Sequence, residues 1–215
     1  MALQTREQHI KREKATSNIC TAQALLATMA GFYAVYHGPE GIRTIAERIH
    51  SIAVFLEKSI NRLGYKQVNA QYFDTLRFAL PDTISAQQIR TIALSKEVNL
   101  RYFKNGDVGM SIDETTDITA VNVLLSIFAI AAGRDWEKAS DVPMASSISA
   151  EMKRQSTYLT HEVFNKYHTE TEMMRYIKRL DRKDISLAHS MISLGSCTMK
   201  LNAAAEMLPL SRPES

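Results

Sequence analysis

The spacing of apolar residues changes period along the chain, and each change restricts what the chain can fold into. Residues 22–36 carry apolar side chains at steps of three and four, the spacing of a helix with one buried face. Gly38-Pro39 follows and predicts the end of that helix, because glycine commonly ends helices and proline cannot continue them. Residues 40–63 resume the helical spacing and end before Gly64. The sequence therefore predicts two consecutive helices.

The apolar pattern then becomes typical of strands. Residues 72–80 are rich in aromatic and branched side chains and predict a strand that ends at Pro81. Alternating apolar residues flank Asn105-Gly106, and this dipeptide accepts the positive φ of a tight turn. The segment around it therefore predicts a hairpin of two antiparallel strands.

Two more helices are predicted between and after these strands. Ser85 and Gln88 fit a capping box, in which the serine oxygen accepts the third-residue amide and the glutamine reaches back. A largely apolar run over residues 117–132 ends at Gly133, a common residue at helix ends. With the strands, these helices predict a compact α+β module over about residues 38–135, with helices packed on a small, largely antiparallel sheet.

The chain changes character after this module. Residues 138–156 contain Pro143 and five serines with weak periodicity, a composition typical of a linker. Thr169 and Glu172 fit a second capping box, which opens a predicted helix through about residue 180. The side chains expected to be buried on this helix are Met173, Tyr176, Ile177 and Leu180.

Composition excludes several classes of protein. With 45% hydrophobic and 23% charged residues, the chain can bury a core, which excludes a disordered protein. Its apolar stretches fall short of the roughly 20 residues that span a bilayer, so we expect a soluble intracellular protein and no membrane partner. Basic and acidic residues are interspersed, 26 against 23, which argues against nucleic-acid binding. Two cysteines, Cys20 and Cys197, are too few for a disulfide framework.

Residue spacing alone provides no complete metal site. His161, His168 and Glu172 could share a helix face, but a structural zinc site needs four ligands. No Cys-x-x-Cys or His-Glu-x-x-His pattern accompanies them, so we expect no metal. Cys197 near Lys200 leaves two interpretations open, a reactive thiol or a small residue in a tight turn.

Several long segments in a fixed order resemble one known family. They are residues 3–21, which begin Leu-Gln-Thr-Arg-Glu-Gln-His-Ile, residues 34–41, residues 158–161, 164–168 and 170–176, and residues 194–203, Leu-Gly-Ser-Cys-Thr-Met-Lys-Leu-Asn-Ala. Glu162 departs from the family, in which proline is expected there. These segments resemble the glycine decarboxylases, the pyridoxal-phosphate-dependent P proteins of the glycine cleavage system. The family members are oxidoreductases also known as glycine dehydrogenase (decarboxylating). The resemblance covers essentially the whole chain.

The resemblance implies a domain organisation. Family members are longer and consist of two homologous halves of fold-type-I α/β architecture, each with a large and a small domain. Residues 1–37 then correspond to the end of the first large domain, and residues 38–140 to the first small domain. Residues 141–157 form a linker, and residues 158–215 begin the second half.

The resemblance also implies an activity and its partners. Family members decarboxylate glycine on pyridoxal phosphate, which stores the electrons released with carbon dioxide, and pass the aminomethyl group to the lipoyl arm of the H protein. The lysine that carries the cofactor lies farther along the second half, in a His-Lys context that Lys200 does not share. We therefore assign no catalytic residue here, and expect the isolated chain neither to hold pyridoxal phosphate covalently nor to decarboxylate glycine.

Nine polar residues are candidates for an edge of the family's active site, where hydroxyl, amide and backbone donors suit an anionic ligand. A structural hydrogen-bonding role at a domain junction is an equally open interpretation of each. The candidates are Ser196, Cys197, Thr198, Lys200, Asn202, His161, Asn165, Tyr167 and His168.

The expected partners follow from the same resemblance. They are the remainder of the P protein and the H protein, in the bacterial cytoplasm or the mitochondrial matrix. The apolar side chains of Leu25, Leu26, Met29 and Phe32 should be partly exposed in the isolated chain, which favours a homo-oligomer. An alternative function is a non-catalytic interaction or regulatory module that pairs with a partner chain.

Overall fold

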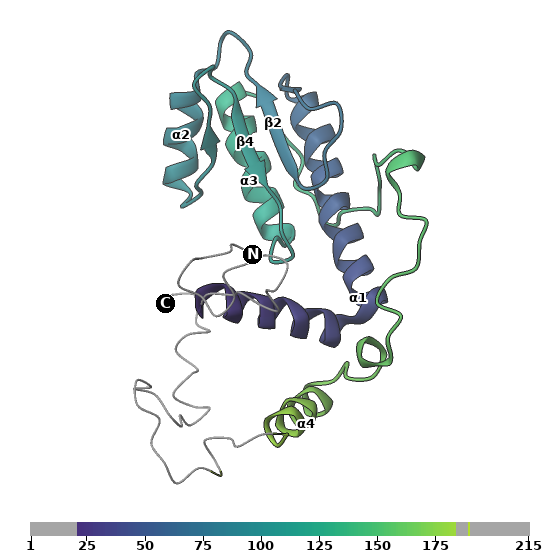
Figure 1. Ribbon diagram of the computed structural model, residues 1–215. Helices are drawn as coiled ribbons and strands as arrows, with labels where there is room; N and C mark the ends of the chain where they lie inside the picture. The colour runs from purple at the N-terminus through teal and green to yellow at the C-terminus, as the bar shows by residue number, and fades with distance from the viewer. Residues whose placement is uncertain (1–20, 184–188, 190–215) are drawn as a thin grey trace, which may run out of the picture. The chain divides into compact units, whose positions relative to one another are not determined.

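The computed structural model describes residues 21–183 and residue 189 (Figure 1). The chain divides into two compact units. Unit 1 comprises Met1–Gly38 and Thr160–Ser215, and unit 2 comprises Pro39–Leu159. Among the described residues, no helix combines the length and the apolarity that a membrane span requires.

Helix α1 (Thr21–Arg62) is interrupted at Gly38, where φ is 62° and ψ is −177°. This backbone conformation is open to glycine and is strained for any residue with a side chain. Pro39 follows, and its fixed φ suits the first turn of the second helical segment. The predicted pair of helices, separated at Gly38-Pro39, is confirmed.

Unit 2 contains a four-stranded antiparallel sheet with the strand order β1-β2-β4-β3. In the central pair, Leu76 lies opposite Met110 and Phe78 opposite Val108, so apolar side chains gather on one face. The strands are β1 (Lys66–Gln67), β2 (Thr75–Ala79), β3 (Arg101–Tyr102) and β4 (Val108–Ser111). The predicted strand over residues 72–80 is confirmed, although it is shorter than predicted.

The predicted hairpin connects β3 and β4. Gly106 has a φ of 90°, as expected for the turn at Asn105-Gly106. The Phe103 amide donates to the Asp107 carbonyl and the Gly106 amide to the Phe103 carbonyl, both at 3.0 Å. The hairpin prediction is therefore confirmed at its turn.

Two capped helices complete unit 2, together with the short 3-10 helix η2 (Ala150–Met152). They are α2 (Ala86–Ser95) and α3 (Ile118–Ala132). The Ser85 hydroxyl accepts the Gln88 amide at 3.1 Å, which confirms half of the predicted capping box. The Gln88 side chain does not reach back; it donates to the Ala131 carbonyl at the end of α3 instead. Asp117 caps the start of α3, and Gly133 ends it with a φ of 59°.

The core of unit 2 lies between one face of the sheet and helices α1, α2 and α3 (Figure 1). The ring centroids of Phe78 and Phe128 are 5.7 Å apart, and the ring of Tyr65 packs edge-on against Phe128 at 5.0 Å. Leu56, Leu76 and Phe78 are fully buried. This arrangement confirms the predicted α+β fold class, in which helices pack on a small antiparallel sheet.

Unit 1 contains the first segment of α1, the 3-10 helix η3 (Glu162–Asn165) and helix α4 (Glu170–Asp181). The Thr169 hydroxyl accepts the Glu172 amide at 3.3 Å and donates to the Glu172 carboxylate, which confirms the predicted start of α4. The predicted burial of Ile177 is wrong, since 44% of its surface is exposed. Met173, Tyr176 and Leu180 are half-buried. Among the described apolar residues of unit 1, Val35 alone is buried, so little of the described chain covers this helix face.

Candidate functional site

Two of the candidate residues, His161 and Asn165, hold the backbone of η3. The Nδ1 atom of His161 accepts the Val163 amide at 3.2 Å, so it caps the first turn. The Asn165 side-chain amide donates to the His161 carbonyl at 3.1 Å. The polar atoms of both residues therefore position the chain just before α4.

His168 joins the start of α4 to the first segment of α1. Its Nδ1 atom lies 2.6 Å from the Tyr36 carbonyl oxygen. Because a carbonyl oxygen only accepts hydrogen bonds, Nδ1 carries the proton and donates it to Tyr36. The imidazole also lies against Gly38, and so it holds the end of the first helical segment.

Tyr167 belongs to a separate aromatic cluster in unit 1. Its ring stacks on that of Tyr176, with centroids 4.3 Å apart and an interplanar angle of 11°. Arg179 donates to the Tyr167 hydroxyl, and its guanidinium lies 5.3 Å from each ring centroid. Sequence reasoning did not identify Arg179, although it follows Tyr176 by three residues on a predicted helix. The four described candidates are thus held by separate partners rather than in one cluster.

The remaining candidates, Ser196, Cys197, Thr198, Lys200 and Asn202, lie outside the described residues. Within residues 21–183, every lysine is exposed. The described part of the chain contains no group of three or more His, Cys, Asp or Glu side chains that could hold a metal ion.

Sequence reasoning missed a set of buried polar side chains in unit 2 that bind the backbone of residues 139–147. His50 is 2% exposed, and its ring stacks on that of Phe73. The Nδ1 atom of His50 lies 2.7 Å from the carbonyl oxygen of Phe73. Its Nε2 accepts the Ser147 amide at 3.0 Å. These two bonds define a neutral imidazole with its proton on Nδ1.

Ser51 and Asn122 act in the same way. The Ser51 hydroxyl accepts the Ala145 amide at 3.0 Å. The Asn122 side chain accepts the Ala139 amide at 2.8 Å and donates to the Ala139 carbonyl at 2.9 Å. A sequence signal existed for Asn122, because it is a polar residue in a largely apolar run. The buried polar groups thereby fasten an extended segment to the helices of unit 2.

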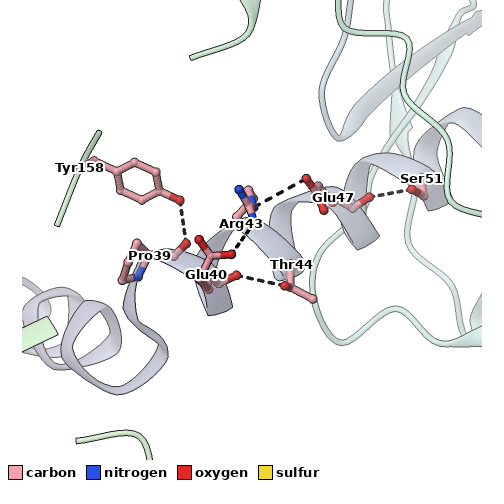
Figure 2. A network of polar contacts seen from close by, with 7 residues as sticks. All are labelled: Pro39, Glu40, Arg43, Thr44, Glu47, Ser51 and Tyr158. Carbon is pink, nitrogen blue, oxygen red and sulfur yellow. Dashed lines mark hydrogen bonds and ion pairs between the residues drawn. The ribbon is translucent and has the colours of Figure 1, made fainter. Parts of the chain in front are cut away.

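A network of polar contacts follows the second segment of α1 (Figure 2). The Tyr158 hydroxyl donates to the Pro39 carbonyl at 2.7 Å, and this bond joins the two ends of unit 2. Arg43 bonds to Glu40 and lies 4.0 Å from a Glu47 carboxylate oxygen. These charged side chains are more than half exposed, so their ion pairs contribute little stability.

Shifted pKa values in unit 2 have structural causes. Burial raises the pKa of Tyr65 to about 12, and it also raises the pKa values of Tyr72 and Tyr102. Hydrogen bonds from Thr115, and more weakly from Thr116, lower the pKa of the Asp113 carboxyl group. These groups belong to the core or to a turn, and so the shifts do not indicate a catalytic site.

Comparison with known families decides what the chain is part of. A family model described as "Glycine cleavage system P-protein" matches residues 1–128, more than half of the chain. The chain belongs to the P-protein family. This confirms the family resemblance that the sequence motifs indicated.

Relatives in the P-protein family are much longer than this chain. A glycine dehydrogenase (decarboxylating) of Bacteroides fragilis is 84% identical over 214 residues, which cover 100% of the chain and 23% of the relative. The Flavobacterium johnsoniae protein of the same name is 54% identical over 99% of the chain and 22% of the relative. The chain therefore spans about a quarter of the curated P proteins it matches.

A solved structure also matches. It is described as glycine decarboxylase (P-protein) of the glycine cleavage system in inhibitor-bound form. The match has 24% identity and a TM-score of 0.48, and covers 60% of this chain and 31% of that one.

Proposed function

We propose that the chain is an internal segment of a glycine decarboxylase. The full-length protein decarboxylates glycine with pyridoxal phosphate and passes the aminomethyl group to the lipoyl arm of the H protein, in the cytoplasm of bacteria. The observation that carries this proposal is an alignment with the B. fragilis relative. The alignment covers the whole of this chain and only 23% of the relative. The segment contributes structure to that enzyme.

The described residues do not fit the cofactor. Pyridoxal phosphate is held through a lysine amine, which acts as a nucleophile when it is neutral and desolvated. Every lysine within residues 21–183 is exposed, so none of them supplies a desolvated amine. No step of the reaction is therefore assigned to a described residue.

The domain assignment forms part of the proposal. Residues 1–37 end the first large domain, residues 38–140 form the first small domain, residues 141–157 link the halves, and residues 158–215 begin the second half. The continuous core of unit 2 supports a small domain in this region. The bonds from His50 and Ser51 to residues 145–147 support a linker whose first part packs on that domain.

The candidate residues are proposed to border the active site of the full-length enzyme. His161 and His168 act in this proposal as positioning residues. A ring nitrogen of each forms a hydrogen bond to a backbone group near α4. We propose that they orient the segment carrying Ser196, Cys197, Thr198, Lys200 and Asn202, which supplies the polar groups themselves.

The proposal is tested with two proteins. One is the 215-residue chain, and the other is a chimera in which this chain replaces the matched residues of the B. fragilis relative. Each is incubated with pyridoxal phosphate, reduced with borohydride and mapped by mass spectrometry, and glycine decarboxylation is assayed with lipoylated H protein.

The chimera should carry the reduced cofactor on one lysine outside this chain and should release carbon dioxide from glycine. The chain alone should do neither. A stoichiometric adduct on a single lysine of the isolated chain, lost in a Lys-to-Arg variant such as Lys200→Arg, would contradict the proposal. A cofactor-loaded chimera without glycine decarboxylase activity would contradict it as well.

A further inference from the structure

We infer that an apolar surface on unit 1 is an internal interface of the P protein, covered in the full-length molecule by polypeptide outside this chain. We call it the helix-pair surface, because it combines the first segment of α1 with α4. The inference uses the proposal that the chain is an internal segment. The residues of the helix-pair surface are Leu25, Leu26, Met29, Tyr33, Met174 and Ile177.

These side chains are far more exposed than apolar residues on a helix stripe usually are. The exposed fractions are 63% for Leu25, 64% for Leu26 and 57% for Met29 on α1. On α4 they are 63% for Met174 and 44% for Ile177. Large apolar side chains exposed on two packed helices favour an interaction site, because water disfavours apolar surface.

The first segment of α1 and α4 pack against each other. The rings of Phe32 on α1 and Tyr176 on α4 meet edge to face, with centroids 6.3 Å apart. The hydrogen bond from His168 to the Tyr36 carbonyl fixes the start of α4 beside the end of the first α1 segment. The exposed residues therefore lie on adjacent helices that hold each other in place.

Unit 2 differs from the described part of unit 1 in having a core. Buried apolar residues from Ile52 to Ala131 give unit 2 a core of its own. In the described part of unit 1, Val35 is the one buried apolar residue. Among the described residues, no core buries the apolar stripes of the unit 1 helices, and a stable fold requires a surface that covers such stripes.

The length of the relatives identifies what covers the surface. The chain aligns in full with a protein of which it makes up 23%, so about three quarters of that molecule is additional polypeptide at fixed stoichiometry. Because the helix-pair surface is apolar, the polypeptide that covers it should be apolar too. A second copy of the chain would be a different occupant, and it would dissociate on dilution.

Methionine oxidation tests the inference without any substitution. Met29 and Met174 belong to the helix-pair surface, whereas Met144 and Met152 of unit 2 are matched controls that are 66% and 68% exposed. The oxidation rates of all four are measured with dilute hydrogen peroxide in the 215-residue chain and in the chimera, each over a range of protein concentrations.

In the dilute chain, all four methionines should oxidise at similar rates, because the rate follows exposure. In the chimera, Met29 and Met174 should oxidise at least about tenfold more slowly relative to Met144 and Met152, at every concentration. Unchanged relative rates in the chimera would overturn the inference. Protection that disappears on dilution would also overturn it, because it would indicate a second copy.

A charge substitution gives a second readout. Leu26→Glu should lower the melting temperature of the chimera, whereas Leu94→Glu on α2, at a site that is 51% exposed, should not. In the isolated chain, neither substitution should change the melting temperature. Equal effects of the two variants on the chimera would contradict a covered helix-pair surface.

The outcomes separate this inference from the proposed function. An active chimera with reactive Met29 and Met174 overturns the interface and leaves the function intact. An inactive chimera in which Met29 and Met174 are protected overturns the proposed function and leaves the interface intact.

Discussion

The imidazole of His168 occupies the space that a side chain on Gly38 would need. A Cβ atom on Gly38 would lie 2.7 Å from Cε1 of His168 and 2.7 Å from the Phe164 carbonyl oxygen. His168 is held there by its hydrogen bond to the Tyr36 carbonyl. The break in α1 and the start of α4 therefore depend on each other, although they are 130 residues apart in the sequence.

Gly38→Ala should destabilise unit 1. The positive φ at Gly38 alone costs a residue with a side chain about 1–3 kcal/mol, and the contact with His168 adds to that cost. Hydrogen exchange should show faster exchange of backbone amides in residues 25–36 and 170–180. Gly31→Ala is the matched control, because a Cβ there meets nothing within 4 Å and should stabilise the helix by about 0.5–1 kcal/mol. Equal exchange in the two variants would show that the contact with His168 is unimportant.

Ser51→Ala should release the segment around Ala145. The Ser51 hydroxyl donates to the Glu47 carbonyl at 2.7 Å and accepts the Ala145 amide at 3.0 Å, so its loss leaves that amide without this acceptor. We expect a loss of about 1–2 kcal/mol in unfolding free energy and faster exchange of the Ala145 amide. Ser126→Ala is the control, since Ser126 is also buried on a helix but bonds to Val123 within its own helix. Unchanged exchange at Ala145 in Ser51→Ala would disprove the fastening role.

Local sequence signals predicted those parts of the fold that depend on neighbouring residues. The caps at Ser85 and Thr169 are confirmed because a side-chain oxygen reaches an amide three residues on. The turn at Asn105-Gly106 and the helix end at Gly133 are confirmed because backbone conformation decides them.

Sequence signals failed where the partner lies far away in the sequence. Gln88 fits a capping box, but its amide bonds to Ala131, 43 residues on. His50 bonds to Ser147 at a separation of 97 residues, and no periodicity indicates such a partner. Ile177 lies on the expected stripe of α4 yet is exposed, because burial depends on the surface that covers the stripe.

Tyr65 should make the protein sensitive to alkali. Burial raises its pKa from 10.0 to about 12, and its hydroxyl donates to the Phe128 carbonyl at 2.9 Å. The unfolded chain loses this proton at the lower pH, so the stabilisation is complete below pH 10 and is lost as pH rises to about 12. The loss amounts to up to about 3 kcal/mol.

Urea denaturation between pH 8 and 12 measures this effect. Tyr65→Phe should lower the unfolding free energy at pH 8, because the hydrogen bond to Phe128 is lost, but should flatten its decline above pH 10. A decline of the same slope in both proteins would mean that another group titrates.

The ion pair between Arg77 and Asp107 should couple β2 to the hairpin of β3 and β4. The Nε atom of Arg77 lies 2.7 Å from the Asp107 carboxylate, and its guanidinium stacks 4.3 Å from the centroid of Phe103. Asp107 is 7% exposed and also accepts the Asn105 side-chain amide at 2.9 Å. The carboxylate thus holds both the turn and the neighbouring strand.

Asp107→Asn should cost about 1–3 kcal/mol of unfolding free energy, because the Arg77 guanidinium loses its anion while it stays partly buried. Arg77→Met should cost a similar amount. The double variant should be less destabilised than the sum of the two, with a coupling of about 1 kcal/mol, since neither residue then leaves an unpaired charge. Urea denaturation of the four proteins gives this coupling directly. Strictly additive losses would mean that the pair contributes through packing on Phe103 and the Asn105 turn rather than through its charges.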